Sequence, residues 1–506
     1  MRTKGDILRG VFGFDGFRPG QEDIIDATLS GRDVLAVMPT GGGKSLCYQI
    51  PALLTRGATF VISPLVSLMK DQVGALRQNG VAAAFLNSTL TPGQYRKALD
   101  NAASGMYRII YIAPERLSSP DFRAFAAARP PERIAVDEAH CVSQWGRDFR
   151  PSYLDIGPFV ESLPFRPTLA AFTATATNRV RTDIVELLGL RDPVRAVGAF
   201  DRPNLFFEVI KGKGGRARDR LLMALMDEQR GRSGIIYCAT RKTVDSVCDM
   251  LRGGGIGAGR YHAGMPDDER RASQDAFASD DTPVLVATNA FGMGIDKSNV
   301  SFIIHYNMPG DLESYYQEAG RAGRDGSDAL CLLLFAPADI MVRKSLIEHG
   351  EDARDPEALR RAKQRLEVMI SYATGGGCLR ARLLRYFGEK PPVRCGSCGN
   401  CAGPRIAESI LAAAQAEPAV RAARVKPKRE ASSAVDAELF ERLKELRLSV
   451  AKAQGIPAYM VFSNATLEDM CRKHPRTLAA MLNVAGVGEH KVRAYGARFL
   501  QVLLDQ

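Results

Sequence analysis

Short apolar runs alternate with longer amphipathic stretches from about residue 33 to residue 335. This alternation is typical of strands and crossover helices in parallel sheets. In the first half the pattern predicts strands at 34–37, 59–62, 109–112, 134–136 and 168–172. After Pro203 a second series is predicted at 233–237, 284–287, 302–305 and 329–334. We therefore expect two successive α/β domains.

The strand pattern stops after Pro337, and residues 356–390 have helical spacing, with basic residues on one side and apolar residues on the other. Residues 405–434 are rich in Ala, Arg, Lys, Pro and Ser, which indicates a linker with one helix near 406–416. Apolar residues return at helical spacing from Asp436 onward. The C-terminal part is therefore predicted to be a small all-α domain.

The composition is that of a globular protein, with 45% hydrophobic and 25% charged residues among 506. The formal net charge of +11 favours polyanionic partners such as nucleic acid. No apolar run approaches the roughly 18 residues of a membrane helix, and the N-terminus has no apolar signal region. We expect a cytoplasmic protein without a membrane partner.

Residues 38–45 read MPTGGGKS directly after a predicted strand and before a helix. Such a loop cradles phosphates with backbone N–H groups at a helix N-terminus. Lys44 would neutralise the outer phosphates, and the Ser45 hydroxyl would ligate Mg²⁺. The first Gly of the usual pattern is Met38 here. The nucleotide-binding residues are predicted to be Thr40, Gly41, Gly42, Gly43, Lys44 and Ser45.

A second motif, IAVDEAH at 134–140, is an apolar strand that ends in two carboxylates and a histidine. Carboxylates at this end of a parallel strand face the ligand crevice. Asp137 would hold Mg²⁺, Glu138 would polarise the attacking water, and His140 would sense the γ-phosphate, as phosphoryl transfer requires.

A third motif, QEAGRAGRDG at 317–326, is predicted at the end of a helix in the second α/β domain. Arg321 and Arg324 would lie on one helical face and reach the phosphate of a nucleotide bound to the first domain. A site shared in this way would couple hydrolysis to relative domain motion.

Four of the ten cysteines are clustered in the order C-x16-C-x2-C-x2-C. Four thiolates at this spacing suit a closed, structural tetrahedral Zn²⁺ site. The predicted ligands are Cys378, Cys395, Cys398 and Cys401.

These motifs, together with FGFDGFRPGQ at 12–21, SPLVSLMKDQ at 63–72, TATAT at 173–177, YHAGM at 261–265 and ATNAFGMGIDK at 287–297, resemble the RecQ family of superfamily 2 helicases. The resemblance implies RecA-like domains at 1–198 and 199–338, a zinc-binding module at 339–404, a basic linker at 405–434 and an HRDC-like domain at 435–506. It also implies that Phe14 stacks on adenine, that Arg18 and Gln21 read the adenine edge, and that Asp296 faces the nucleotide.

The segment CVSQWGRDFRPSY at 141–153 resembles the aromatic-rich loop through which this family couples DNA contact to hydrolysis. Aromatic and basic side chains in one loop can stack bases and touch phosphates. Predicted DNA contacts are Ser67, Trp145, Arg147, Phe149, Arg150, Arg241, Thr288 and Asn289. In the C-terminal domain, backbone N–H groups at 486–488 are a further candidate phosphate contact.

The resemblance implies an ATP-dependent 3′ to 5′ DNA helicase of recombination, repair and the SOS response, associated with the nucleoid. Its cofactors would be ATP, Mg²⁺ and Zn²⁺, and its partners single-stranded and partially duplex DNA and a single-strand DNA-binding protein. Most of the family carry a winged helix after the zinc module, whereas about 30 residues of linker stand here. Two alternatives are a translocase or annealing factor with weak unwinding, and a DNA-binding scaffold with a dead nucleotide site. Charge alone does not distinguish DNA from RNA.

Overall fold

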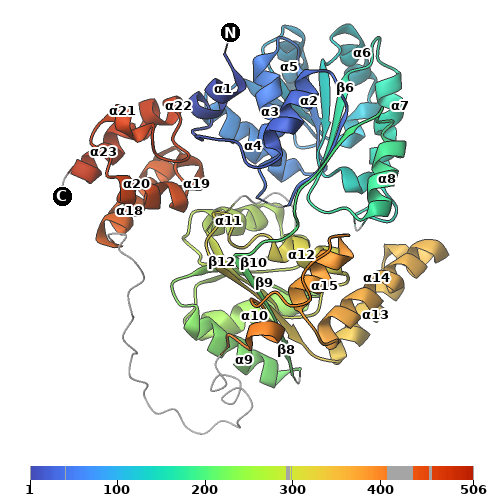
Figure 1. The fold of residues 1–506 in the computed structure, drawn as a ribbon, viewed down its shortest axis with the longest axis vertical. Helices are drawn as coiled ribbons and strands as arrows, with labels where there is room; N and C mark the ends of the chain where they lie inside the picture. Colours follow the sequence, from blue (N-terminus) through green and yellow to red (C-terminus); the bar gives the residue numbers. More distant parts are fainter. Residues whose placement is uncertain are drawn as a thin grey trace.

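The computed structural model describes residues 2–39, 41–146, 148–212, 214–291, 297, 299–406, 437–454 and 458–504. Two α/β domains lie one above the other in Figure 1, with a helical zinc module beside the second and a C-terminal helical domain beside the first. The predicted fold class is confirmed.

The first domain is built on a seven-stranded, wholly parallel sheet in the order β3-β4-β2-β5-β6-β1-β7. Its central strands are buried along their whole length, which explains their nearly continuous apolar sequences. The strands are β1 (Val34–Val37), β2 (Thr59–Ile62), β3 (Ala83–Leu86), β4 (Ile109–Ile112), β5 (Arg133–Val136), β6 (Thr168–Thr173) and β7 (Val194–Val197).

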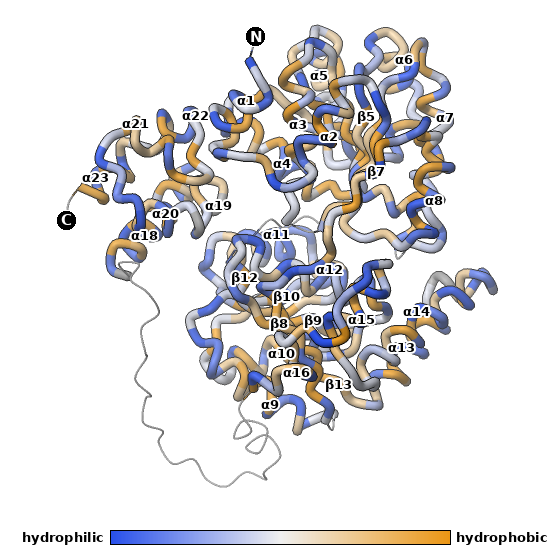
Figure 2. Tube along the Cα trace, in the orientation of Figure 1, coloured by the Kyte–Doolittle hydropathy of each residue, from blue (hydrophilic) through white to orange (hydrophobic). Residues whose placement is uncertain are grey.

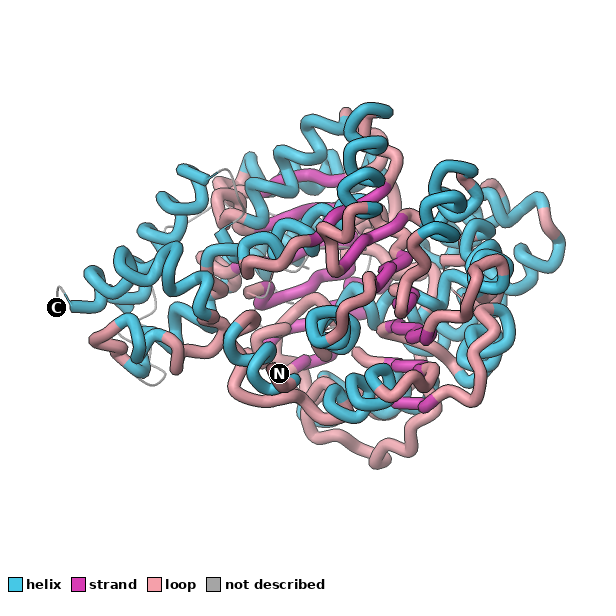
Figure 3. Tube along the Cα trace, turned by 90° about the horizontal axis from the view of Figure 1, so that it is seen from above, coloured by secondary structure: helices cyan, strands magenta, loops and turns pink. Residues whose placement is uncertain are grey.

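Helices cover both faces of this sheet, and Figure 3 shows the strands between helical layers. The α-helices are α1 (Lys4–Gly10), α2 (Gln21–Leu29), α3 (Lys44–Leu54), α4 (Val66–Gln78), α5 (Pro92–Ala103), α6 (Pro120–Ala128), α7 (Ile156–Glu161) and α8 (Asn178–Leu187). Three short 3₁₀ helices follow strands or loops: η1 (Pro114–Ser118), η2 (Ala139–Val142) and η3 (Pro151–Asp155).

The second domain has a six-stranded parallel sheet in the order β10-β11-β9-β12-β13-β8. Its strands are β8 (Leu205–Lys211), β9 (Ser233–Tyr237), β10 (Ala258–Tyr261), β11 (Val284–Ala287), β12 (Val300–His305) and β13 (Ala329–Phe335). Its helices are α9 (Arg216–Glu228), α10 (Arg241–Gly253), α11 (Asp267–Ala278) and α12 (Leu312–Ala319). In Figure 2 the central strands of both sheets are coloured largely toward the hydrophobic end of the scale.

Four strands were not identified in the sequence, and each lies at the edge of a sheet: β3, β7, β8 and β10. An edge strand pairs on one side only and can face solvent, so its sequence need not be continuously apolar. In β7 half-buried and exposed residues alternate, and β10 reads AGRY.

The zinc module contains the helices α13 (Ala338–Glu348), α14 (Pro356–Thr374), α15 (Leu379–Tyr386) and α16 (Gly399–Ala402), with the 3₁₀ helix η4 (Glu351–Arg354). The C-terminal domain contains α18 (Ala437–Gln454), α19 (Ala458–Val461), α20 (Asn464–Lys473), α21 (Leu478–Met481), α22 (Glu489–Lys491), the π-helix η5 (Val492–Gly496) and α23 (Ala497–Leu504). Among the described helices, none has the length and apolar character needed to span a membrane.

Candidate functional site

The phosphate loop connects β1 to α3, as its sequence predicts. Gly41 and Gly43 have φ values of +82° and +77°, a left-handed conformation that glycine adopts without strain. Lys44 is the first residue of α3, and its Nζ lies 3.3 Å from the Met38 carbonyl oxygen. The amino group therefore stands over the loop, at the helix N-terminus where phosphates bind.

Two of the residues expected to read adenine hold the phosphate loop in this structure. The Gln21 amide donates to the carbonyls of Gly42 and Gly43, at 3.2 and 3.1 Å, and its Oε1 accepts from the Arg18 backbone N–H at 2.8 Å. The Arg18 guanidinium donates to the Gly41 carbonyl. Phe14 is 40% exposed, so its ring is available for stacking. These contacts join the predicted base-reading segment to the predicted phosphate-binding segment.

The two carboxylates of the second motif follow β5 at the centre of the sheet. Asp137 is 6% exposed and accepts from the Ser63 hydroxyl at 3.5 Å. Glu138 has φ +48°, an unusual conformation for a residue with a side chain, and its Oε2 lies 3.2 Å from His140 Nδ1. His140 Nδ1 also lies 2.9 Å from Thr173 Oγ1, in the TATAT segment. The predicted water-activating group is thus connected through His140 to the TATAT segment.

Electrostatics link Asp137 to its neighbours. Burial, and after it the Glu138 charge, raise the pKa of Asp137 to about 7, while Lys44 opposes the rise. A carboxyl whose charge is disfavoured without a cation is suited to receive one. Asp137, together with Ser45 at the second position of α3, therefore fits the predicted Mg²⁺ ligand set.

Arg321 and Arg324 lie in turns after α12, not on its surface, because the helix ends at Ala319. Arg321 is 5% exposed. The Cγ atom of Arg324 lies 3.6 Å from the position that a Cβ on Gly41 would occupy. The expectation of a shared helical face was wrong, but the structure does bring Arg324 from the second domain to the phosphate loop of the first.

Arg202 also reaches the phosphate loop and was missed in the sequence. Its Nη1 lies 3.9 Å from the same Cβ position on Gly41. Its Nη2 donates to the carbonyls of Ala322 and Gly323, at 3.0 and 2.7 Å. Arg202 thus holds the turn that carries Arg324. Arg202 belongs to no motif identified in the sequence. The one feature that could have pointed to it is its position in the segment that connects the two predicted α/β domains.

Trp145 is half-buried in the loop between η2 and η3 and packs at the margin of the core. Phe149 and Arg150 are half-buried in the same loop. Arg150 pairs with Asp148 at 3.2 Å and donates to the Pro64 carbonyl at 2.9 Å. The loop therefore contacts the SPLVSLMKDQ segment, which supplies another predicted DNA contact.

The other predicted DNA contacts lie at the starts of helices or in turns. Arg241 begins α10 and is exposed, and Asn289 is exposed after β11. The Thr288 hydroxyl accepts from the Ala290 backbone N–H at 3.3 Å, so it organises a turn. Several predicted features lie outside the described residues. They are Thr40, Arg147, Asp296, the side chain of Ser67, and all but the first residue of the helix expected at 406–416.

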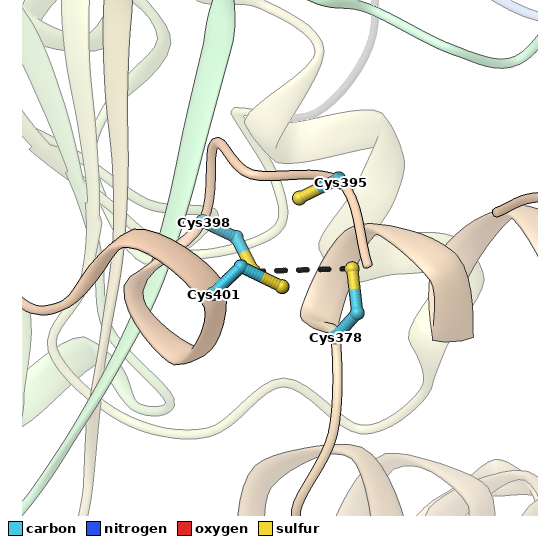
Figure 4. Close-up of side chains that lie close together, drawn as sticks. All are labelled: Cys378, Cys395, Cys398 and Cys401. Atoms are coloured by element: carbon cyan, nitrogen blue, oxygen red, sulfur yellow. Dashed lines mark hydrogen bonds between the residues drawn. The ribbon is translucent and has the colours of Figure 1, made fainter. Parts of the chain in front are cut away.

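The four clustered cysteines converge as predicted (Figure 4). Their sulfur atoms all lie within 4.8 Å of one another, and those of Cys378 and Cys398 are 4.0 Å apart. Tetrahedral ligation with Zn–S bonds of about 2.3 Å requires sulfurs about 3.8 Å apart, so these residues fit zinc. Cys378 caps α15, and Cys398 caps α16 and bridges to Phe207 in β8. Zinc at this site would tie the module to the second domain.

The C-terminal domain docks on both α/β domains. Gly486 donates its N–H to the Gly13 carbonyl at 2.8 Å, and Met460 packs against Gly74 in α4. On the other side, Arg447 pairs with Asp280 at 3.2 Å. The Gly486 and Val487 N–H groups are thus engaged within the protein, the latter with Val484, and neither is presented to a phosphate here.

Sequence models of four protein families match the chain in the order of these units. They are "DEAD/DEAH box helicase" over residues 18–184, "Helicase conserved C-terminal domain" over 217–326, "RecQ zinc-binding" over 337–402 and "HRDC domain" over 436–503. These matches leave residues 403–435 uncovered.

Curated relatives match over nearly the whole chain. "ATP-dependent DNA helicase RecQ" of Bacillus subtilis is 38% identical, covering 98% of this chain and 97% of the relative. The protein of the same name from Pasteurella multocida is 36% identical, covering 99% and 94%. A solved structure, the DUF1998 helicase MrfA bound to DNA, has a TM-score of 0.56 at 19% identity, covering 69% of this chain and 52% of that one, and supports the fold.

Proposed function

Since this chain belongs to the RecQ family of ATP-dependent DNA helicases, we propose that it hydrolyses ATP to move 3′ to 5′ along single-stranded DNA and separate strands during recombination and repair. The polarity and the biological role rest on the family. A single-strand DNA-binding protein is a natural partner because it would hold the separated strands, and such work would take place at the nucleoid.

One observation supports the motor mechanism: side chains of both α/β domains meet at the phosphate loop. Lys44, Asp137 and Glu138 belong to the first α/β domain, whereas Arg324 approaches Gly41 from the second. Negative charge on a phosphate bound between the two domains would attract the basic groups of both. Loss of that phosphate after hydrolysis would let the two domains separate. Relative motion of the domains is the step that translocation needs.

Within this site we assign the roles by position. Lys44 and the loop glycines would hold the phosphates, Ser45 and Asp137 would hold Mg²⁺, and Glu138 would orient the attacking water. Bound Mg²⁺ would supply charge neutralisation between phosphate oxygens. His140 would hold Glu138 in its strained conformation through the contacts at 3.2 Å with Glu138 and 2.9 Å with Thr173.

The second candidate is a translocase or annealing factor with weak unwinding. Two observations favour it. No matched family model covers residues 403–435, between the zinc-binding and HRDC models. The alignment with the Bacillus relative spans 580 positions, whereas this chain has 506 residues. The relative therefore contains segments that this chain lacks. A winged helix of more than about 50 residues would not fit in the uncovered stretch.

ATP turnover measured with and without single-stranded DNA tests the motor. The wild-type protein should hydrolyse ATP faster with DNA, and Glu138→Gln should abolish turnover while DNA binding persists. Near-normal turnover in Glu138→Gln would refute the assigned site. No turnover in wild type would restore the scaffold hypothesis.

A further inference from the structure

His305 is a buried histidine at the end of β12 in the second α/β domain. Its Nε2 lies 2.9 Å from Glu318 Oε2, in the last turn of α12, and the two side chains are 1% and 6% exposed. A carboxylate only accepts hydrogen bonds, so His305 Nε2 is the donor. The pair ties the end of a core strand to the end of the helix that precedes Arg321 and Arg324.

Glu318 begins the turn that carries these two arginines. The Arg321 N–H donates to the Glu318 carbonyl at 3.2 Å. Two residues further on, the Gly323 N–H donates to the carbonyl of Val300, at the start of β12, at 2.9 Å. The strand β12 therefore holds the turn on both sides of Arg321, through the Val300 backbone at its start and through the His305 side chain at its end.

The position of Arg321 depends on this turn. Arg321 is 5% exposed, yet its Nε has no hydrogen-bond partner among the residues that the structure describes. A buried polar group without a partner is costly, and a phosphate of the nucleotide is an anion that the guanidinium could meet. Because Nε is not anchored to the protein, the backbone of the turn has to set where the guanidinium lies.

The imidazole of His305 is itself held by aromatic rings. The ring of Tyr237, at the end of β9, stacks on it with the centres 5.4 Å apart, and the ring of Tyr315 in α12 lies 4.8 Å from it. The Tyr237 hydroxyl donates to the Phe291 carbonyl at 2.9 Å, which fixes that ring in turn. His305 is therefore a rigid support, and Glu318 is held where this support places it.

We propose that His305 is a positioning residue for ATP hydrolysis, because it holds Glu318 and so places the turn from which Arg321 reaches the nucleotide on the first domain. This inference rests on the proposed function. An arginine that stabilises charge developing in phosphoryl transfer is effective only where it is preorganised. Loss of the support should therefore lower kcat, while the KM for ATP, which reflects contacts of the first domain, changes little.

ATP turnover of the full-length protein at saturating single-stranded DNA tests this role. His305→Leu removes the donor and should lower kcat about tenfold or more, with the KM for ATP within about twofold of wild type. His305→Gln should restore most of kcat, because its amide nitrogen can donate to the same carboxylate. As a control for lost stability, Leu222→Ala opens a cavity in buried α9 of the same domain and should leave kcat unchanged. Equal kcat in His305→Leu and wild type, or equal losses in His305→Leu and His305→Gln, would overturn the proposal.

A double-mutant cycle with Arg321→Ala gives the second readout. If His305 acts through Arg321, then His305→Leu should cost little further activity in a protein that already lacks the guanidinium. Losses that multiply would overturn the proposal, as would normal kcat in Arg321→Ala. If His305→Leu does not fold, its combination with Glu318→Gln removes the unpaired buried charge and takes its place in the cycle. Absence of DNA-stimulated turnover in wild type would instead refute the proposed function, and this inference with it.

Discussion

Arg447 Nη2 lies 3.2 Å from Asp280 Oδ2, and this ion pair joins the C-terminal helical domain to the second α/β domain. The Arg447 side chain is 2% exposed and also donates to the Phe462 carbonyl at 3.1 Å. Asp280 is shared with Lys297, and despite burial the two cations hold its pKa below the ordinary value. The docked position of the domain thus depends on a buried charge network.

Arg447→Ala should release the C-terminal domain from the motor. Removing one partner of a buried ion pair costs about 3–5 kcal/mol because the other charge is left unpaired. Small-angle scattering should show a larger radius of gyration, whereas Arg498→Ala, an exposed change in the same domain, should leave it unchanged. An unaltered radius in Arg447→Ala would show that the contacts around Gly13 suffice for docking.

Asp137→Asn should stabilise the nucleotide-free protein at pH 8. The pKa of Asp137 is raised in the folded state from 3.8 to about 7, so its ionised form weakens the fold above pH 7. This penalty fades as the pH falls from 7 towards 4, at about 1.4 kcal/mol for each unit. The difference in unfolding temperature between variant and wild type should therefore shrink between pH 8 and pH 5. A difference independent of pH would contradict the assigned pKa.

Cys398→Ser should lower both zinc content and stability. Freshly purified wild-type protein is expected to carry about one zinc ion per chain, since the four sulfurs fit a closed tetrahedral site. Metal analysis of the variant should show loss of zinc, while Cys248→Ala, a buried cysteine outside the cluster, should retain it. Wild-type protein without zinc would refute the site.

Trp145→Ala should uncouple DNA from hydrolysis. Basal ATP turnover should persist while stimulation by single strands is blunted, because stacking contributes about 1–3 kcal/mol per base. Phe165→Ala removes an exposed aromatic ring elsewhere in the same domain and should leave stimulation intact. Full stimulation of Trp145→Ala at saturating DNA would assign the indole a packing role.

Sequence patterns predicted the features of the fold that depend on neighbouring residues, namely the central strands and the short motifs. Central strands such as β2 and β9 are bounded as expected because burial on both faces demands apolar runs. The spacing of residues within a motif reflects the local geometry of that motif. This is why the sequence revealed the phosphate loop, the carboxylates after β5 and the cysteine cluster. The edge strands β7 and β10 were missed because their sequences are not continuously apolar.

Contacts between domains could not be predicted in the same way. Arg202 at the phosphate loop, Arg361 over Trp145 and Arg447 against Asp280 are each set by how separate units pack. No spacing in the sequence encodes that packing. The engagement of the Gly486 N–H with Gly13, within the segment expected to contact phosphate, is likewise set by domain packing.

We propose that the motor is complete and that the duplex-separating wing is missing. The most direct test compares ATP turnover on single-stranded DNA with unwinding of 3′-tailed and forked duplexes of increasing length, using one preparation of the full-length protein. We predict strong DNA-stimulated turnover and unwinding that falls steeply as the duplex lengthens. Processive unwinding of long forks, equal to that of relatives with a winged helix, would contradict the account and place the strand-separating element in the motor or the zinc module.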